Sequence, residues 1–126
     1  TRKLNRESMY FLASDADSRE GIGFGWDVVS SFLGCEEQAL RKYILGGDPK
    51  HLPWRVESRL NFLIEVVNLL RGSYNTKGIW HWFFRTRTQL DGKTPAQIFN
   101  AYWDSEDAEP QKVLNLAKSL AAGNAT

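Results

Sequence analysis

The chain has 126 residues, which is enough to bury one good hydrophobic core or two small cores that share a helix. Its net charge of +1 gives no overall electrostatic attraction to nucleic acid or to a membrane surface, so any such binding has to depend on local charge. The single cysteine excludes an intrachain disulfide, and one cysteine with two histidines leaves too few ligands for a zinc site of the usual kind.

No apolar run approaches the roughly 20 residues of a membrane-spanning helix, and no apolar segment follows the basic N-terminal residues as it would in a signal peptide. We therefore expect a cytoplasmic protein without a membrane partner, in agreement with a lone cysteine in a reducing compartment. The aromatic fraction of 13%, with five tryptophans, indicates a wide packing or contact surface.

The N-terminal part of the chain divides into two segments of different character. Residues 1–13 carry apolar side chains at spacings that allow a short amphipathic helix. Residues 14–25 are polar, with glycines at positions 21, 23 and 25. A dinucleotide-binding motif needs a preceding strand and a βαβ context, and neither is present, so we predict a turned loop.

Three helices are predicted next, because apolar residues recur every three or four positions at 26–33, 35–45 and 54–70. Gly34 separates the first two helices, and a glycine-rich segment that ends at Pro49 terminates the second. The apolar stripe at 54–70 is so wide that this helix should be central, with packing partners on two sides.

The segment 79–99 is rich in apolar residues, and its pattern predicts a helix, a turn and a second helix. Five of six consecutive positions are aromatic or aliphatic: Ile79, Trp80, Trp82, Phe83 and Phe84. A turn follows at 90–93, where Asp91 and Gly92 both tolerate positive φ. Thr94 offers a hydroxyl N-cap and Pro95 suits the first helical position, so the second helix should begin here.

The C-terminal part of the chain predicts two helices joined by an acidic loop. The helix that begins after Thr94 continues to Trp103, the acidic loop occupies 104–109, and Pro110 opens a final helix that stops near Gly123. No segment has a convincing strand pattern, so the predicted fold class is all-α.

The helices on either side of Gly34 fit a helix-turn-helix at 26–45, with Gly34 as its ninth position. The positions that such a motif buries hold apolar or small residues, namely Trp26, Val29, Ser30, Leu33, Cys35, Leu40 and Tyr43. The second helix would enter the major groove of DNA, with these candidate contact residues: Glu37, Gln38, Arg41 and Lys42. The acidic residues at 36 and 37 count against DNA binding, because they lie at the end of the helix that would approach the negatively charged DNA. A helical hairpin that binds no DNA therefore stays open as the alternative.

In this order the motifs resemble the Xre/MbcA/ParS-type antitoxins, the partners of RES-domain toxins. The resemblance covers roughly residues 26–123 and is carried by Trp82-Phe83, the Leu90-x-Gly92-x-x-Pro95 turn, Ile98-Phe99 and the final helix ending near Gly123. It implies two regions that share the helix at 54–70. The N-terminal helical region, 1–70, contains the helix-turn-helix at 26–45, and the C-terminal region, 71–126, binds the toxin. The implied function is to bind and neutralise a cognate RES-type toxin and, as a homodimer, to repress its own operon by binding operator DNA.

Residues 71–93 contain five positive charges and one negative charge, which suit an acidic toxin surface or a pocket for nucleotide phosphates. We expect Trp82 and Phe83 to enter the core. The candidate partner-binding residues are Trp80, Phe84, Arg85, Arg87 and Lys93, with Lys112 and Lys118 on the final helix. The alternative is that these basic residues form a solvent-exposed face and bind no partner.

No constellation of residues predicts catalysis, so we expect a protein that is not an enzyme and has no cofactor or metal. His51 and His81 are isolated, Cys35 is assigned to a turn, and the carboxylates have no apparent apolar pocket that would tune a general acid. The leading alternative function is a stand-alone DNA-binding transcriptional regulator whose C-terminal half dimerises. A third, weaker alternative is an enzyme centred on Cys35 and a histidine.

Overall fold

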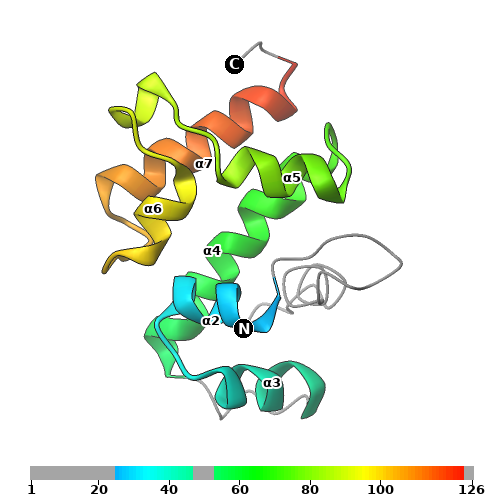
Figure 1. Cartoon of the computed structure of the whole chain (residues 1–126), viewed down its shortest axis with the longest axis vertical. Coiled ribbons are helices and arrows are strands. Elements are labelled where there is room, and N and C mark those ends of the chain that lie inside the picture. The colour runs from blue at the N-terminus through cyan, green and yellow to red at the C-terminus, as the bar shows by residue number, and fades with distance from the viewer. Residues whose placement is uncertain (1–24, 47–52, 124–126) are drawn as a thin grey trace.

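The computed structural model describes residues 25–46 and 53–123, and the predictions for residues 1–24 and 47–52 lie outside this part. The described chain forms six α-helices and one 3-10 turn (Figure 1): α2 Trp26–Leu33, α3 Glu37–Gly46, α4 Trp54–Arg71, α5 Thr76–Phe83, η2 Thr88–Leu90, α6 Pro95–Asn100 and α7 Ala108–Ala121. The described residues contain no strand beyond an isolated bridge between Arg87 and Lys93. The all-α prediction is therefore confirmed.

Helix α4 is the central helix of the described chain, as its wide apolar stripe predicted. It packs against α7, α5 and α2, and in Figure 1 it runs through the middle of the molecule. Apolar side chains are buried around much of its circumference, from Val56 near its start to Leu70 near its end. A helix that is apolar on several sides has to be covered by several partners, which places the other helices around it.

Aromatic rings from four helices and one connecting segment meet in the core. Phe99 of α6 lies 5.9 Å from Phe32 of α2 and 4.8 Å from Trp103, measured between ring centroids. It also contacts Phe83 of α5 at 6.0 Å and Phe62 of α4 at 6.2 Å. The side chains of the two predicted regions therefore belong to one continuous hydrophobic core.

The turn between η2 and α6 has the backbone that its sequence predicted. Asp91 and Gly92 adopt φ values of 58° and 81°, in the left-handed region that this Asp-Gly pair tolerates. The Arg87 N–H donates to the carbonyl of Lys93 at 3.1 Å and closes the turn. We call the segment that runs from α5 through this turn to α6 the hairpin.

Helix α6 begins as predicted and ends earlier than predicted. Thr94 and Gln97 form a reciprocal capping box, with bonds of 3.0 Å from the Gln97 N–H to Thr94 Oγ1 and 2.8 Å from the Thr94 N–H to Gln97 Oε1. The helix stops at Asn100, because Ala101 is extended and the chain turns to place Trp103 in the core. The prediction that it continues to Trp103 was wrong.

The predicted acidic loop is shorter than its composition indicated, since α7 begins at Ala108 and includes Glu109 in its first turn. Asp107 is the N-cap residue, and its Oδ2 accepts the Asp104 N–H at 2.9 Å. Acidic side chains stabilise the positive end of a helix dipole, so the acidic residues help to start α7. No described helix is both long enough and apolar enough to cross a membrane.

Candidate functional site

The turn between α2 and α3 has the geometry that the glycine predicted. Gly34 has φ 73°, and its N–H donates to the Ser30 carbonyl at 2.8 Å; the Cys35 N–H donates to the same oxygen at 3.1 Å. The predicted apolar positions on both helices are buried, from Trp26 and Val29 to Leu40 and Tyr43. Helix α3 begins at Glu37, two residues after the predicted start, and Cys35 lies half-buried in the turn.

The residues predicted to contact DNA on α3 differ in their surroundings. Arg41 donates to Glu37 Oε2 from Nε at 3.0 Å and from Nη2 at 2.9 Å, and its guanidinium lies 4.8 Å from the ring of Trp26. Gln38 and Lys42 are exposed. The Arg41 charge is paired within its own helix, so Gln38 and Lys42 are the exposed candidates for DNA contact. DNA binding itself stays a prediction.

The aromatic residues of α5 and the residue that follows it divide between core and surface as predicted. Trp82 and Phe83 are buried, whereas the side chain of Phe84 is 41% exposed. Phe84 and the half-buried Trp80 are paired, with ring centroids 4.4 Å apart. The next residue, Arg85, is also exposed. We call Trp80, Phe84 and Arg85 the hairpin surface.

Arg87, predicted to bind a partner, contributes to the structure of the hairpin itself. Its guanidinium lies 4.6 Å from the ring of Trp82, and its Nε is buried. Burial lowers the pKa of Arg87 below its ordinary value, and the positive charge of nearby Arg85 lowers it further. Of these two arginines, Arg85 is the better placed to meet a partner.

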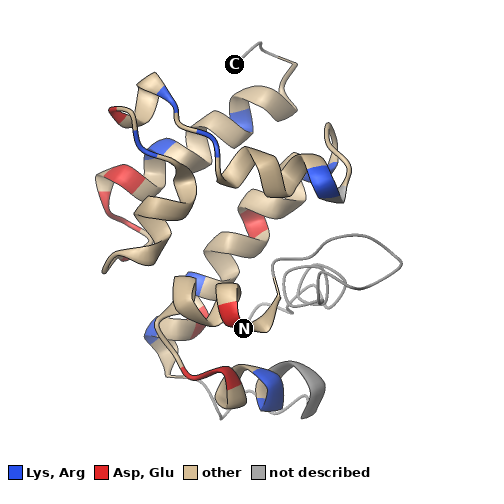
Figure 2. Ribbon diagram, in the orientation of Figure 1, with Lys and Arg blue, Asp and Glu red and all other residues tan. Residues whose placement is uncertain are grey.

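The lysines predicted to bind a partner lie at the turn and on α7. Lys93 Nζ is 2.7 Å from Glu109 Oε2, an ion pair that joins the turn to the start of α7. This hydrogen bond raises the pKa of Lys93. Lys112 and Lys118 are exposed on α7. Figure 2 shows basic segments along the connection between α5 and α6 and on α7.

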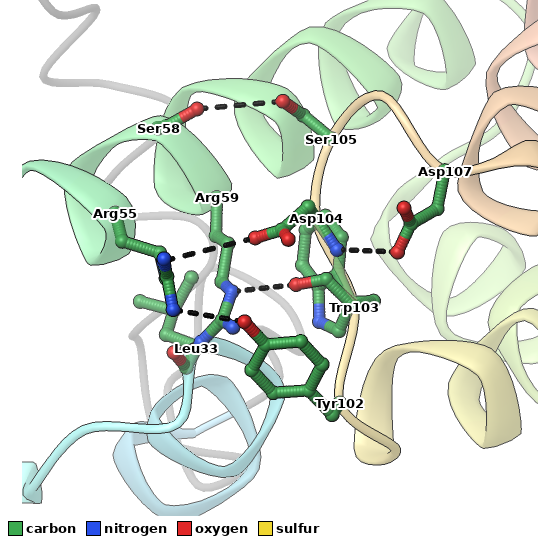
Figure 3. A network of polar contacts seen from close by, with 9 residues as sticks. All are labelled: Leu33, Arg55, Ser58, Arg59, Tyr102, Trp103, Asp104, Ser105 and Asp107. Atoms are coloured by element: carbon green, nitrogen blue, oxygen red, sulfur yellow. Dashed lines mark hydrogen bonds and ion pairs between the residues drawn. The ribbon is translucent and has the colours of Figure 1, made fainter.

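A groove of about 610 Å³ that the sequence did not reveal lies between the end of α2, the start of α4 and the segment after α6. Trp54 and Tyr102, which line it, are the most exposed large aromatic residues of the described chain, at 74% and 72%. Arg55 Nη1 donates to the Tyr102 hydroxyl at 2.8 Å (Figure 3), and its guanidinium lies 5.6 Å from the Trp54 ring. We call this site the arginine groove.

Arg59 lies at the base of the arginine groove and is only 7% exposed. Its Nε donates to the carbonyl of Trp103 at 2.8 Å and its Nη1 donates to the carbonyl of Leu33 at 2.7 Å (Figure 3). The guanidinium is 5.2 Å from the ring of Tyr102. Arg59 therefore connects α4 to the end of α2 and to the segment after α6.

The arginine groove was missed because its residues come from three distant parts of the sequence. One local signal was available: Arg59 interrupts the apolar stripe of the central helix next to Leu60 and between Val56 and Leu63. A charged residue within such a stripe has to find polar partners when it is buried. Its partners are backbone carbonyls, and sequence spacing does not identify those.

Of the residues considered for catalysis, Cys35 is half-buried in the turn after α2. Burial raises the pKa of the Cys35 thiol, and the positive charge of Arg59 opposes this effect only partly. His81 is exposed and His51 lies outside the described residues. Within residues 25–46 and 53–123, no group of three or more His, Cys, Asp or Glu side chains has a geometry that could hold a metal ion.

Tyr43 and Glu57 connect α3 to the central helix, and this contact leads to a prediction. The Tyr43 hydroxyl donates to Glu57 Oε2 at 2.8 Å. Burial is the main cause that raises the pKa of Tyr43 well above its ordinary value of 10.0, and this hydrogen bond raises it further. The folded state then holds the phenolic proton more tightly than the unfolded state. The resulting stability is fully present below pH 10 and is lost as the pH rises through the folded-state pKa.

An alkaline titration followed by tyrosinate absorbance should therefore contain a late step that is missing in Tyr43→Phe. The same substitution should lower the free energy of unfolding near neutral pH by about 1–2 kcal/mol, because the hydrogen bond to a charged acceptor is lost. A late step that persists in Tyr43→Phe would contradict this prediction.

No protein-family model, curated protein or solved structure matches this chain. Two surfaces of the described residues combine exposed aromatic rings with exposed arginine. They are the hairpin surface, with Phe84 and Arg85, and the arginine groove, with Trp54, Arg55 and Tyr102. Tryptophan, tyrosine and arginine are the residue types most enriched where protein interfaces derive their binding energy.

Proposed function

We propose that this chain is an antitoxin-like protein that binds a cognate toxin stoichiometrically and covers the toxin's active site. The observation that carries the proposal is the hairpin surface. Phe84 leaves an aromatic ring 41% exposed beside Trp80, and the exposed Arg85 follows directly. An exposed aromatic ring next to an arginine provides the two kinds of anchor that most often dominate a protein interface.

The backbone of the hairpin supports this proposal because it is held before any partner arrives. The capping box of Thr94 and Gln97 orders the start of α6, and the bond from the Arg87 N–H to the Lys93 carbonyl closes the preceding turn. The ion pair of Lys93 with Glu109 joins that turn to α7. A preorganised surface loses less conformational entropy on binding.

The resemblance to the Xre/MbcA/ParS-type antitoxins indicates the class of partner, a RES-type toxin. The positive charge of Arg85 suits an acidic toxin surface or a pocket that normally holds the phosphates of a nucleotide. Repression of the operon by a homodimer is a second proposed activity. It would use Gln38 and Lys42, which are exposed on α3.

Co-purification with the product of the neighbouring gene tests the proposal. We expect a stable complex for the unaltered chain, and an affinity at least about thirtyfold lower for Phe84→Ala and for Arg85→Glu, the loss expected of an interface anchor. Arg87→Glu is a poorer test, because Arg87 packs on Trp82 and its loss would disturb the hairpin. The control is Lys42→Glu on α3, which should bind the toxin normally.

The results distinguish the two functional hypotheses. A complex that tolerates Phe84→Ala and Arg85→Glu would move the interface away from the hairpin surface. Absence of any complex, together with salt-dependent retention on DNA from upstream of the gene, would favour the stand-alone regulator. In that case Lys42→Glu, the toxin control, should weaken DNA binding and reduce its salt dependence.

A further inference from the structure

We infer that the arginine groove is a second protein-binding site, which accepts an acidic segment of a partner in which a carboxylate lies beside a large apolar side chain. The groove shares no lining residue with the hairpin surface, so this inference goes beyond the proposed function. It concerns the isolated chain and does not require a toxin. The occupant follows from the charges, the exposed rings and the rigidity of the groove.

The charges that line the groove are of one sign. Arg55 and Arg59 are its charged lining residues, and no described acidic residue lines it. Two further lining residues are polar and neutral, and the Ser31 hydroxyl donates to Asn100 Oδ1 at 2.7 Å. A groove lined by two guanidinium groups favours an anionic occupant.

The two arginines leave positive charge available for a partner. Arg55 has its nearest described carboxylate at Asp104, with 3.9 Å between Arg55 Nε and Asp104 Oδ1 (Figure 3). Charge-assisted hydrogen bonds are about 2.7–2.9 Å long, so this pair is loose and a closer carboxylate can replace it. The hydrogen-bond acceptors of Arg59 are the neutral carbonyls of Leu33 and Trp103, which leave its charge without a carboxylate partner among the described residues.

The exposed rings indicate the other half of the occupant. Trp54 and Tyr102 leave most of their surface in contact with solvent, although both belong to residue types that usually bury much of it. An apolar side chain placed on these rings would remove that surface from water next to the guanidinium of Arg55. Together the groove provides one site for a carboxylate and one for an apolar group.

The number of cations favours a peptide over a nucleic acid. A nucleic-acid strand carries one phosphate per nucleotide and is bound by a tract of cations along its length. The arginine groove has two arginines, and Arg59 is buried and bonded to two carbonyls. Such a site suits a peptide segment that has one carboxylate beside a large apolar side chain.

The test is a nuclear magnetic resonance titration of the isotopically labelled full chain with a blocked tripeptide, glutamate-phenylalanine-glutamate, at millimolar concentrations. The matched neutral probe is glutamine-phenylalanine-glutamine. We expect the acidic peptide to shift the indole N–H signal of Trp54 and the backbone signals of Arg55 and Tyr102. It should bind at least about tenfold more tightly than the neutral peptide, since a charge-assisted bond is lost in the latter.

Two variants locate the site without disturbing the core, because both residues are exposed. Arg55→Gln and Tyr102→Ala should each weaken binding of the acidic peptide about tenfold, while Lys118→Gln on α7 should leave it unchanged. The inference is overturned if no groove signal shifts, if the two peptides bind equally, or if a thymidine hexanucleotide binds the groove more tightly than the acidic peptide. The toxin complex is not used, so failure of the proposed function would not affect this result.

Discussion

Trp103→Ala should lower the free energy of unfolding by about 3–5 kcal/mol, the usual loss when a fully buried tryptophan is truncated. The side chain of Trp103 is 2% exposed, and its ring packs against Phe99 and Phe62 at centroid distances of 4.8 Å and 5.6 Å. Its Nε1 donates to the carbonyl of Phe32 at 2.8 Å. The substitution therefore leaves a cavity in the aromatic core and an unpaired carbonyl at the end of α2.

Denaturant unfolding of three variants would separate these contributions. Trp103→Phe keeps most of the aromatic ring but removes the indole donor. The hydrogen bond lost in this way should lower the free energy of unfolding by about 1–2 kcal/mol, in addition to the small effect of the changed packing. Tyr102→Ala is the matched control, because the neighbouring ring is exposed and its loss should change stability by no more than about 0.5 kcal/mol. Equal losses for Trp103→Ala and Tyr102→Ala would refute the assigned role of Trp103.

Arg59→Met should be destabilising by about 3 kcal/mol, even though methionine suits a buried helical position. The substitution removes the donors to the carbonyls of Leu33 and Trp103, and each buried carbonyl left unpaired costs about 1–3 kcal/mol. The Leu33 carbonyl is one of the terminal carbonyls of α2, which have no partner within the helix. Regained packing and the removal of a buried charge offset part of the loss.

The same unfolding measurement tests the geometry of Arg59. Arg59→Lys should restore little stability, because an ammonium group lacks the planar fork that reaches both carbonyls. Arg55→Met, at the exposed arginine one turn earlier, is the matched control and should have a small effect. The double variant of Arg59 and Trp103 should lose less than the sum of the single losses, because both residues stabilise the end of α2 and share contacts.

These two residues attach the α2–α3 pair to the rest of the described chain. Arg59 and Trp103 donate to consecutive carbonyls at the end of α2, those of Leu33 and Phe32. The helix that leads into the predicted recognition helix is thereby bonded to the central helix and to the segment after α6. Loss of either bond should loosen this attachment before it affects the hairpin surface.

Several features of the fold follow from local sequence signals. The wide apolar stripe predicted the central helix, and the Asp91-Gly92 pair and Thr94 predicted the turn and the start of α6. The separation of the buried Trp82 from the exposed Phe84 was also predicted. Each of these features depends on residues within a few positions of one another, through helical spacing, backbone φ preference or capping.

Local sequence patterns predicted the all-α class, the central helix and the hairpin turn, whereas the end of α6 and the arginine groove depend on contacts between distant segments. Local spacing favoured a helix up to Trp103, but the indole bonds to Phe32, which is 71 positions earlier in the chain. Arg59 is likewise buried because Leu33, 26 positions earlier, and Trp103 offer carbonyls. A buried donor is stable only where acceptors meet it, and packing of distant segments brings those acceptors together.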